Sequence, residues 1–189
     1  MQVNLKAIAH KVTDSELLQL SSDNPDTKFE TDKEGKLTIV SPTGSNSGKF
    51  NLALAAQVWL WNSQSKMGVA FDSSTGFILS NGAIKSPDVS WIELSRWNEL
   101  TQEQQDRFAP IDPDFVIELK SPTDRLDDLQ RKMQEYIDCE VKLGWLINPT
   151  DKQVEIYRQG QEVEVLDNPD TLSGEDILPD LIVDLTDIF

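Results

Sequence analysis

The chain has 189 residues, of which 26% are charged and 38% are hydrophobic, and it carries a formal net charge of −16. This length favours a single domain, while the negative charge argues against a broad nucleic-acid-binding face, because phosphate contacts need Lys and Arg. His10 is the only histidine and Cys139 the only cysteine, which excludes an intrachain disulfide and zinc sites rich in His or Cys. A catalytic metal would need mostly oxygen ligands, which favours Mg²⁺ or Mn²⁺.

The first half of the chain predicts two helices around a short hairpin. Thr13-x-x-Glu16 is a capping-box pattern, which predicts the start of a helix. Apolar residues at helical spacing predict a longer helix further on. In chain order we expect a short helix from Thr13 through Leu20 that ends at Asn24-Pro25-Asp26, strands at 28–31 and 36–40, a loop at 41–48, and a helix at 49–66.

The second half alternates between strand and helix patterns and contains the most apolar strand of the chain. In chain order we expect strands at 69–71, 76–79 and 87–92, one or two short helices within 93–107, a strand at 115–119, a helix from 125 to about 140, strands at 143–147, 153–157 and 162–166, and a short C-terminal strand with a helical turn within 178–189. The pattern predicts one α/β (α+β) domain over residues 1–189 with a mixed sheet.

The sequence carries no pattern typical of a membrane or secretion segment. No stretch approaches the run of roughly twenty apolar residues that spans a bilayer. Residues 1–10 mix polar and apolar side chains, without the long apolar run of a signal peptide. We therefore expect a cytoplasmic protein with no membrane partner.

Glu118-Leu119-Lys120, at the end of the apolar strand, is the strongest candidate for an active site. Alternate residues of a strand point to one face about 7 Å apart, so Glu118 and Lys120 share a face. Asp88 begins another predicted strand, which can lie beside the first. Two carboxylates of this kind can hold a metal ion, and a lysine beside them favours the attacking water and the developing phosphate charge.

Other acid-x-lysine and Pro-Asp pairs occur in the sequence, but their contexts are turns, loops or helix ends. Asp114 shares the strand of Glu118, yet four residues separate their backbones by roughly 13 Å, which is long for one ion. The motif also has a structural interpretation, in which Glu118 and Lys120 form an ion pair at the sheet edge. The residues alone leave both interpretations open.

The helix after this strand brings cationic residues near the proposed site. We expect Thr123 or Asp124 to cap its N-terminus. Its polar face then presents side chains that can touch phosphates, namely Arg125, Gln130, Arg131 and Lys132. The alternative is an ordinary solvated face, balanced by acidic residues of the same helix, namely Asp127, Asp128 and Glu135.

Several longer motifs together resemble the Uma-two family of restriction-endonuclease-like proteins. The motifs cover nearly the whole chain and are SPTG (41–44), FDSSTGF (71–77), SPDVS (86–90), DFVIELKSPTD (114–124) with the helix that follows, GWLINP (144–149) and VEIYR (154–158). The resemblance implies a PD-(D/E)xK nuclease core, in which a mixed central sheet flanked by helices presents the site, preceded by an N-terminal helix and hairpin.

The resemblance also implies roles for individual residues. Asp88 looks like the first metal ligand, Glu118 like the second, and Lys120 like the catalytic lysine. Glu30 and Asn51 fall where relatives often carry polar residues near the site. Many proteins with this core act as dimers, so a homodimer is expected by the same analogy.

Three functional hypotheses follow from the sequence. The first is an endonuclease that uses Mg²⁺ to hydrolyse the phosphodiester bonds of DNA with a metal-activated water. The second is a catalytically inactive nuclease-like fold that serves as an acidic interaction module, which the net charge of −16 favours. In the third, the acidic surface binds a basic protein partner and no active site is needed.

Overall fold

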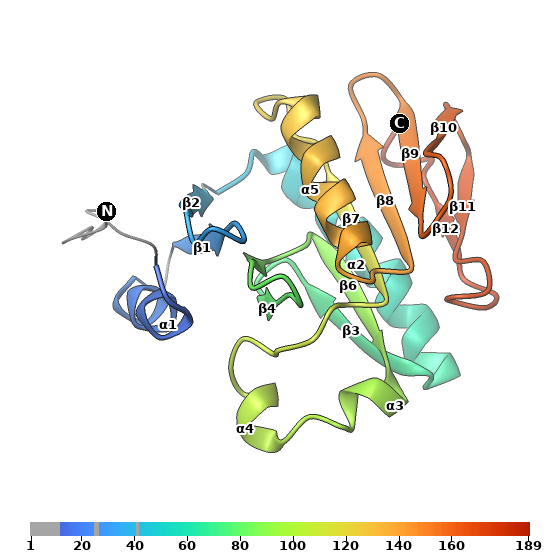
Figure 1. The fold of residues 1–189 in the computed structure, drawn as a ribbon. Coiled ribbons are helices and arrows are strands. Elements are labelled where there is room, and N and C mark those ends of the chain that lie inside the picture. The colour runs from blue at the N-terminus through green and yellow to red at the C-terminus, as the bar shows by residue number, and fades with distance from the viewer. Residues whose placement is uncertain (1–11, 25–26, 41) are drawn as a thin grey trace.

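A six-stranded sheet forms the centre of the computed structural model, which describes residues 12–24, 27–40 and 42–189. Helix α2 (Ser45–Ser65) covers one face of the sheet and α5 (Leu126–Asp138) covers the other (Figure 1). In spatial order the strands are β10 (Glu164–Asp167), β9 (Gln153–Arg158), β8 (Leu143–Asn148), β7 (Phe115–Leu119), β6 (Val89–Glu93) and β3 (Gly68–Asp72). His10, the predicted helix end at Pro25-Asp26 and Ser41 lie outside the described residues.

One connection in this sheet crosses over, and it contains α5. Strands β7 and β8 are parallel, whereas the other neighbouring strands are antiparallel. A parallel pair needs a long crossover that covers one face of the sheet. Helix α5 supplies it, so its side chains lie over the strand that carries the Glu118 motif.

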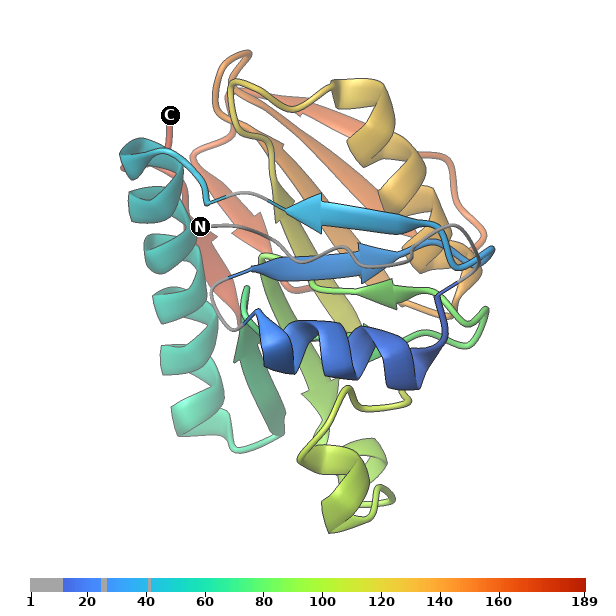
Figure 2. The same cartoon turned by 90° about the vertical axis from the view of Figure 1, so that its left-hand side faces the viewer.

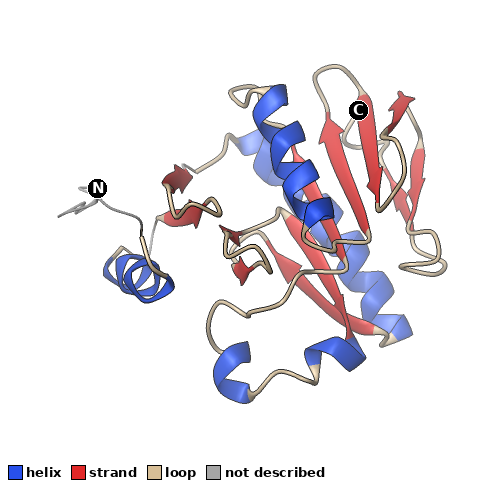
Figure 3. Ribbon diagram, viewed as in Figure 1, coloured by secondary structure: helices blue, strands red, loops and turns tan. Residues whose placement is uncertain are grey.

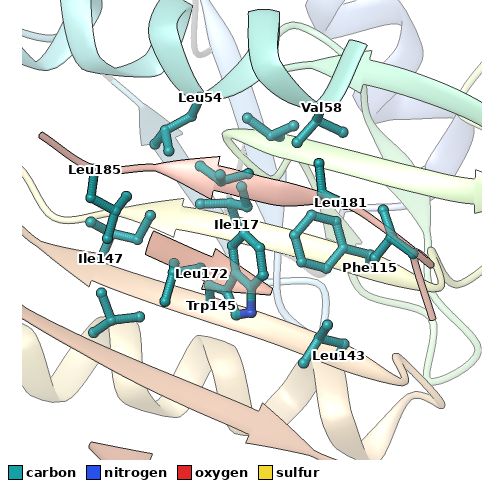
Figure 4. Packing of buried hydrophobic residues seen from close by; sticks show 14 of the residues in the cluster. Leu54, Val58, Phe115, Ile117, Leu143, Trp145, Ile147, Leu172, Leu181 and Leu185 are labelled. Carbon is teal, nitrogen blue, oxygen red and sulfur yellow. The ribbon is translucent and has the colours of Figure 1, made fainter. Parts of the chain in front are cut away.

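The apolar residues of β7 build the core on the α2 side of the sheet. Phe115 and Ile117 are fully buried and pack in one cluster with Leu54 and Val58 of α2 (Figure 4). Trp145 of β8 meets Phe115 edge-on, with ring centroids 4.7 Å apart, an arrangement that aromatic rings prefer.

The alternate residues of β7 face α5. Val116 packs with Met133 of α5 and with Leu146 of β8 in a second buried cluster. Because strand residues two apart share a face, Glu118 points to the same side as Val116. A charged side chain therefore lies under α5, at the end of an otherwise apolar strand.

A second sheet of four short strands lies beside the large one (Figure 2). In spatial order its strands are β2 (Leu37–Val40), β1 (Lys28–Thr31), β5 (Ile84–Lys85) and β4 (Phe77–Ile78). Helix α1 (Asp14–Asp23) packs on it, with Leu17 of the helix in one buried cluster with Phe29 of β1. Since β1 pairs with β5, the N-terminal hairpin is held next to the segment that leads into β6.

The remaining elements are short (Figure 3). Helices α3 (Leu94–Trp97) and α4 (Gln102–Gln105) lie between β6 and β7, and β11 (Thr171–Ser173) pairs with β12 (Ile182–Asp184) near the C-terminus. Among the described residues no helix has both the length and the hydropathy to cross a membrane.

The mixed sheet flanked by helices, preceded by a helix and hairpin, is confirmed. The capping box of Thr13 and Glu16 is present at α1, and the predicted strand at 115–119 has the bounds of β7. The expected loop at 41–48 is wrong in its second half, because α2 begins at Ser45 after Gly44. Its first turn is rich in Ser and Asn, which the sequence pattern equates with a loop although the first turn of a helix accepts them.

Two further expectations need correction. Neither Thr123 nor Asp124 caps α5, because Arg125 holds the N-cap position and makes no side-chain cap. Asp124 instead accepts a hydrogen bond from the backbone N–H of Ser121 at 2.8 Å and closes the preceding turn. Strands β5 (Ile84–Lys85) and β11 (Thr171–Ser173) were not predicted, since two or three residues are too few to show strand periodicity.

Candidate active site

Asp88 lies next to the end of the β6–β7 ladder, near Glu118. The last paired residues at this end are Val89 and Ile117, and Asp88 and Glu118 are the next residues of each strand. The charge of Asp88 acts on the carboxyl of Glu118. The Oδ2 atom of Asp88 also accepts a hydrogen bond from the backbone N–H of Leu119 at 2.8 Å, which fixes its carboxylate at the end of β7.

Asn51 of α2 completes the surroundings of Asp88. Its Nδ2 donates to Oδ1 of Asp88 at 3.1 Å. Its Oδ1 is buried and has no hydrogen-bond partner among the described residues. A buried acceptor without a partner costs about 1–3 kcal/mol, so this oxygen is available to a water or a cation beside Asp88.

Glu118 is buried and is held by two residues of α5. Its Oε1 accepts a hydrogen bond from the hydroxyl of Tyr136 at 2.9 Å and lies 2.8 Å from the Nζ atom of Lys132. Lys132 and Tyr136 are four residues apart, so they lie one above the other on the face of α5 that covers the sheet. The expected position of Lys132 on the polar, phosphate-contacting face is therefore wrong.

Glu30, on β1, joins the cluster from the second sheet. Its Oε1 lies 3.0 Å from Nζ of Lys132 and accepts a hydrogen bond from the backbone N–H of Ser86 at 3.1 Å. Nζ of Lys28 donates to the carbonyl oxygen of the same Ser86 at 2.7 Å. The hairpin thus holds the segment immediately before Asp88.

Burial and shared charge set the protonation of this cluster. Burial, aided by the negative charges of Asp88 and Glu30, raises the pKa of Glu118 to about 7, and Lys132 opposes the rise. Burial also acts to raise the pKa of Glu30, but Lys132 and Lys28 outweigh it and hold that pKa below its ordinary value. Burial acts to lower the pKa of Lys132, but Glu118 and Glu30 outweigh it, so the ammonium stays protonated.

Lys120 lies at the same end of the sheet but forms no hydrogen bond or ion pair with Asp88 or Glu118 among the described residues. Its backbone N–H donates to the carbonyl of Ile147 at 2.8 Å and continues the β7–β8 ladder. Its Nζ donates to the carbonyl of Ser121 at 3.3 Å, a long contact. The ammonium that contacts Glu118 is therefore that of Lys132. The ammonium of Lys120 is held only by the long hydrogen bond to Ser121.

Asp114, at the other end of β7, forms a separate cluster. Its Oδ1 lies 2.8 Å from Arg96 and 2.8 Å from Lys142, and its Oδ2 accepts from the backbone N–H of Glu93 at 2.8 Å. This agrees with the sequence argument that Asp114 is too far along the strand to share an ion with Glu118.

The exposed face of α5 is an ordinary solvated surface. Arg125 and Arg131 both pair with Asp128 on the same helix, and Gln130 donates to Glu155 at 2.7 Å. Of the four side chains proposed to touch phosphates, Lys132 alone reaches the site.

The donor set suits a hard cation with few protein ligands. Asp88, Glu118 and the free amide oxygen of Asn51 offer oxygen atoms, which Mg²⁺ and Mn²⁺ prefer. Within the described part of the chain no three His, Cys, Asp or Glu side chains are grouped closely enough to hold a metal. Mg²⁺ is commonly bound by only one or two carboxylates, with water and substrate phosphate as the other ligands, so the residues fit such an ion.

Lys132 and Tyr136 contact Glu118 more directly than their sequence context suggests. Their spacing places both on the apolar face of α5 together with buried Met133, and this was the available signal. A buried lysine on that face needs a carboxylate partner, and Glu118 on the strand before α5 is such a carboxylate. Glu30 could not be placed from local patterns, because it comes from a hairpin about a hundred residues away.

Comparisons with known proteins concern the family and the fold of the chain. A family model described as "Uma2: Putative restriction endonuclease" matches residues 14–186 of the chain. The chain is also similar to a crystal structure from Anabaena variabilis, described as a "putative nuclease belonging to DUF820", with a TM-score of 0.76 and 23% sequence identity. The match covers 94% of this chain and 97% of that one, and at this identity it concerns the fold. No curated protein matches the chain.

Proposed function

We propose that this chain, which belongs to the Uma2 family of restriction-endonuclease-like proteins, is a metal-dependent endonuclease that hydrolyses phosphodiester bonds of DNA. The observation that carries the proposal is the pair of carboxylates at one end of the sheet. Asp88 and Glu118 each lie one residue beyond the Val89–Ile117 pair that ends the β6–β7 ladder, and the hydrogen bonds of Leu119 and Tyr136 hold their carboxylates there.

Asp88 and Glu118 would hold a Mg²⁺ or Mn²⁺ ion, with Asn51 offering its free oxygen to the ion or to a bound water. When bound, such an ion polarises a phosphate oxygen and lowers the pKa of a water. The protein residues fix the carboxylates before substrate arrives. Asp88 accepts hydrogen bonds from Asn51 and Leu119, and Glu118 accepts one from Tyr136 and is ion-paired with Lys132. This fixed arrangement reduces reorganisation during the reaction.

Lys120 is assigned to the reacting phosphate. Its Nζ makes only a long contact to the carbonyl of Ser121, so it can turn towards a phosphate oxygen or an attacking water at small cost. Lys132 cannot take this role without giving up its ion pairs with Glu30 and Glu118. The two lysines therefore have different roles. Lys132 keeps the carboxylates in place, and Lys120 stabilises the charge that develops on the phosphate.

The net charge of −16 limits how the substrate is bound. Phosphate contacts supply most non-specific affinity for DNA, and the exposed arginines of α5 are already paired with Asp128. We therefore expect weak, salt-sensitive binding of DNA, centred on Lys28 and Lys120 beside the site. Recognition by a bound metal and a few lysines fits an enzyme better than a stable DNA-binding protein.

The proposal is tested by cleavage of supercoiled plasmid in the presence of Mg²⁺ or Mn²⁺. The wild-type protein should nick or linearise the plasmid, and EDTA should abolish the reaction. Asp88→Asn and Glu118→Gln should both be inactive while remaining folded. Asp127→Asn, which removes an exposed carboxylate of α5, is the matched control and should cleave as wild type does. Cleavage that survives in either site variant would refute the assignment.

The acidic interaction module remains the second candidate, and one observation favours it. Lys132 already pairs with Glu30 and Glu118, so the cluster can exist as a closed ion pair network without a metal. Titration calorimetry with Mn²⁺ separates the candidates. Binding heat in the wild type that is lost in Glu118→Gln supports the enzyme, and absence of binding heat in both supports the module.

A homodimer is the assembly we propose, through the outer face of α2. Leu52, Trp59 and Leu60 are 71%, 61% and 53% exposed, and Trp59 and Leu60 lie about two turns of the helix after Leu52. Lys49 is the only charged residue among the 21 residues of α2, so two copies can meet there without like-charge repulsion in a protein of net charge −16. Light scattering should give a dimer for the wild type and a monomer for Trp59→Lys, and a monomeric wild type would refute this part.

A further inference from the structure

Lys132 occupies a position in the cluster that resembles that of a bound cation. Its Nζ bridges Oε1 of Glu30 and Oε1 of Glu118 at 3.0 and 2.8 Å, and its side chain is only 16% exposed. The two carboxylates come from different sheets, so the ammonium is the link that holds β1 against the end of β7. A metal ion shared by two carboxylates would hold them in the same way.

The other cation beside this pair lies farther out. Nζ of Lys28 is 4.0 Å from Oε1 of Glu30 and donates to the carbonyl oxygen of Ser86. Among the described residues, Lys132 is therefore the ammonium that contacts both Glu30 and Glu118.

We propose that the ammonium of Lys132 takes the place of a second metal ion between Glu30 and Glu118, so that the site binds one divalent cation at Asp88 and Glu118. The inference rests on the proposed metal-dependent function. It deepens that function, because it predicts how many ions the site holds and which residue sets that number.

The fold keeps Lys132 in this place. The preceding turn of α5 carries Leu129 and the following one carries Tyr136, which binds the same Glu118 oxygen as Lys132. Ser86 donates its backbone N–H to Glu30 from the opposite side. The ammonium is therefore enclosed by groups that orient both of its carboxylate partners, and its removal would leave an acidic pocket for a second ion.

The test counts Mn²⁺ ions by titration calorimetry of the metal-free protein. The wild type should bind one Mn²⁺ per chain, and Lys132→Met, which keeps the length of the side chain and removes its charge, should bind two. Lys132→Arg should again bind one. Lys142→Met is the control, since Lys142 is ion-paired to Asp114 at the other end of β7, and this variant should bind one.

The count can be read even if Lys132→Met is unfolded without metal. Folding would then depend on Mn²⁺ binding, and the folded fraction should rise with the second power of the Mn²⁺ concentration. A variant that binds one ion, or that does not fold at any Mn²⁺ concentration, overturns the proposal. A wild type that binds two ions also overturns it. A wild type that binds no Mn²⁺ defeats the proposed metal-dependent function itself, so the two failures are distinguishable.

Discussion

The two ends of β7 carry buried carboxylates on the same face with opposite charge balance. At the start of the strand, Asp114 is paired with two cations, Arg96 and Lys142. At its end, Glu118 shares the ammonium of Lys132 with Glu30, Lys28 lies 4.0 Å from Glu30, and Asp88 lies nearby. In the first cluster two cations face one carboxylate, whereas in the second three carboxylates face two ammonium groups, an excess of negative charge that favours a divalent cation. Local charge balance therefore separates a structural ion pair from a candidate metal site within one strand.

Asp88→Asn should show the largest effect, on cleavage. Loss of one carboxylate removes a metal ligand, and the rate of plasmid cleavage should fall by at least about 10²–10³-fold, the usual effect of losing one charge-stabilising group. Circular dichroism and melting should remain close to wild type, because Asn still accepts the hydrogen bond of Leu119. Cleavage within tenfold of wild type would break the contrast between the two ends of β7.

Asp114→Asn should show the opposite behaviour, with a large loss of stability and no direct effect on cleavage. Removing the shared carboxylate charge leaves Arg96 and Lys142 without their partner, and because their side chains are 29% and 42% exposed, solvent screens them and the loss should be about 1–3 kcal/mol. Urea unfolding measures the loss. Cleavage per folded molecule, at a temperature where the variant is folded, should equal that of wild type. A variant that is stable but inactive would contradict the structural role of Asp114.

The pH dependence of stability should differ between wild type and Glu118→Gln in EDTA. Because the pKa of Glu118 is raised to about 7 in the folded protein, the folded state binds a proton that the unfolded state releases at lower pH. The stability that this proton supplies is present at low pH and is lost as pH rises through about 7. The Gln variant cannot lose it, so its stability relative to wild type should improve by on the order of 2 kcal/mol between pH 5 and pH 8. A difference that does not change with pH would show that burial and the neighbouring carboxylates do not raise the pKa of Glu118 in the folded protein.

Tyr136→Phe should give the smallest effect. The variant loses the 2.9 Å hydrogen bond to Glu118, which contributes about 1 kcal/mol, while Lys132 continues to hold the same oxygen. Thermal melting should show a small decrease in stability, and Mn²⁺ should still bind at one ion per chain. A loss of Mn²⁺ binding would mean that Tyr136, rather than the charge balance, decides whether Glu118 can act as a ligand.

The sequence predicts the framework of this site better than its interior. The alternation in 115–119 places Glu118 on one face of a buried strand, and the helical spacing after it predicts α5. Asp88 and Glu118 come near one another once the predicted strands at 87–92 and 115–119 lie side by side. These features are local, or follow from the strand period.

The partners of Glu118 were harder to predict because they depend on tertiary contacts. Lys132 is charged and was expected on the polar face of α5, although its spacing from Tyr136 places it on the apolar face, and its contact with Glu30 depends on where the hairpin packs. Glu30 reaches the site through the pairing of β1 with β5 (Ile84–Lys85), a strand too short to be recognised from its sequence. The single domain, the cytoplasmic location and the homodimer stay predictions.

A crystal structure of the protein soaked with Mn²⁺, with the ion located by its anomalous scattering, tests the central claim most directly. One peak should lie between the carboxylates of Asp88 and Glu118, with Nζ of Lys132 still bound to Glu30. No peak at that position, or a peak beside Asp114 in its place, would contradict the account.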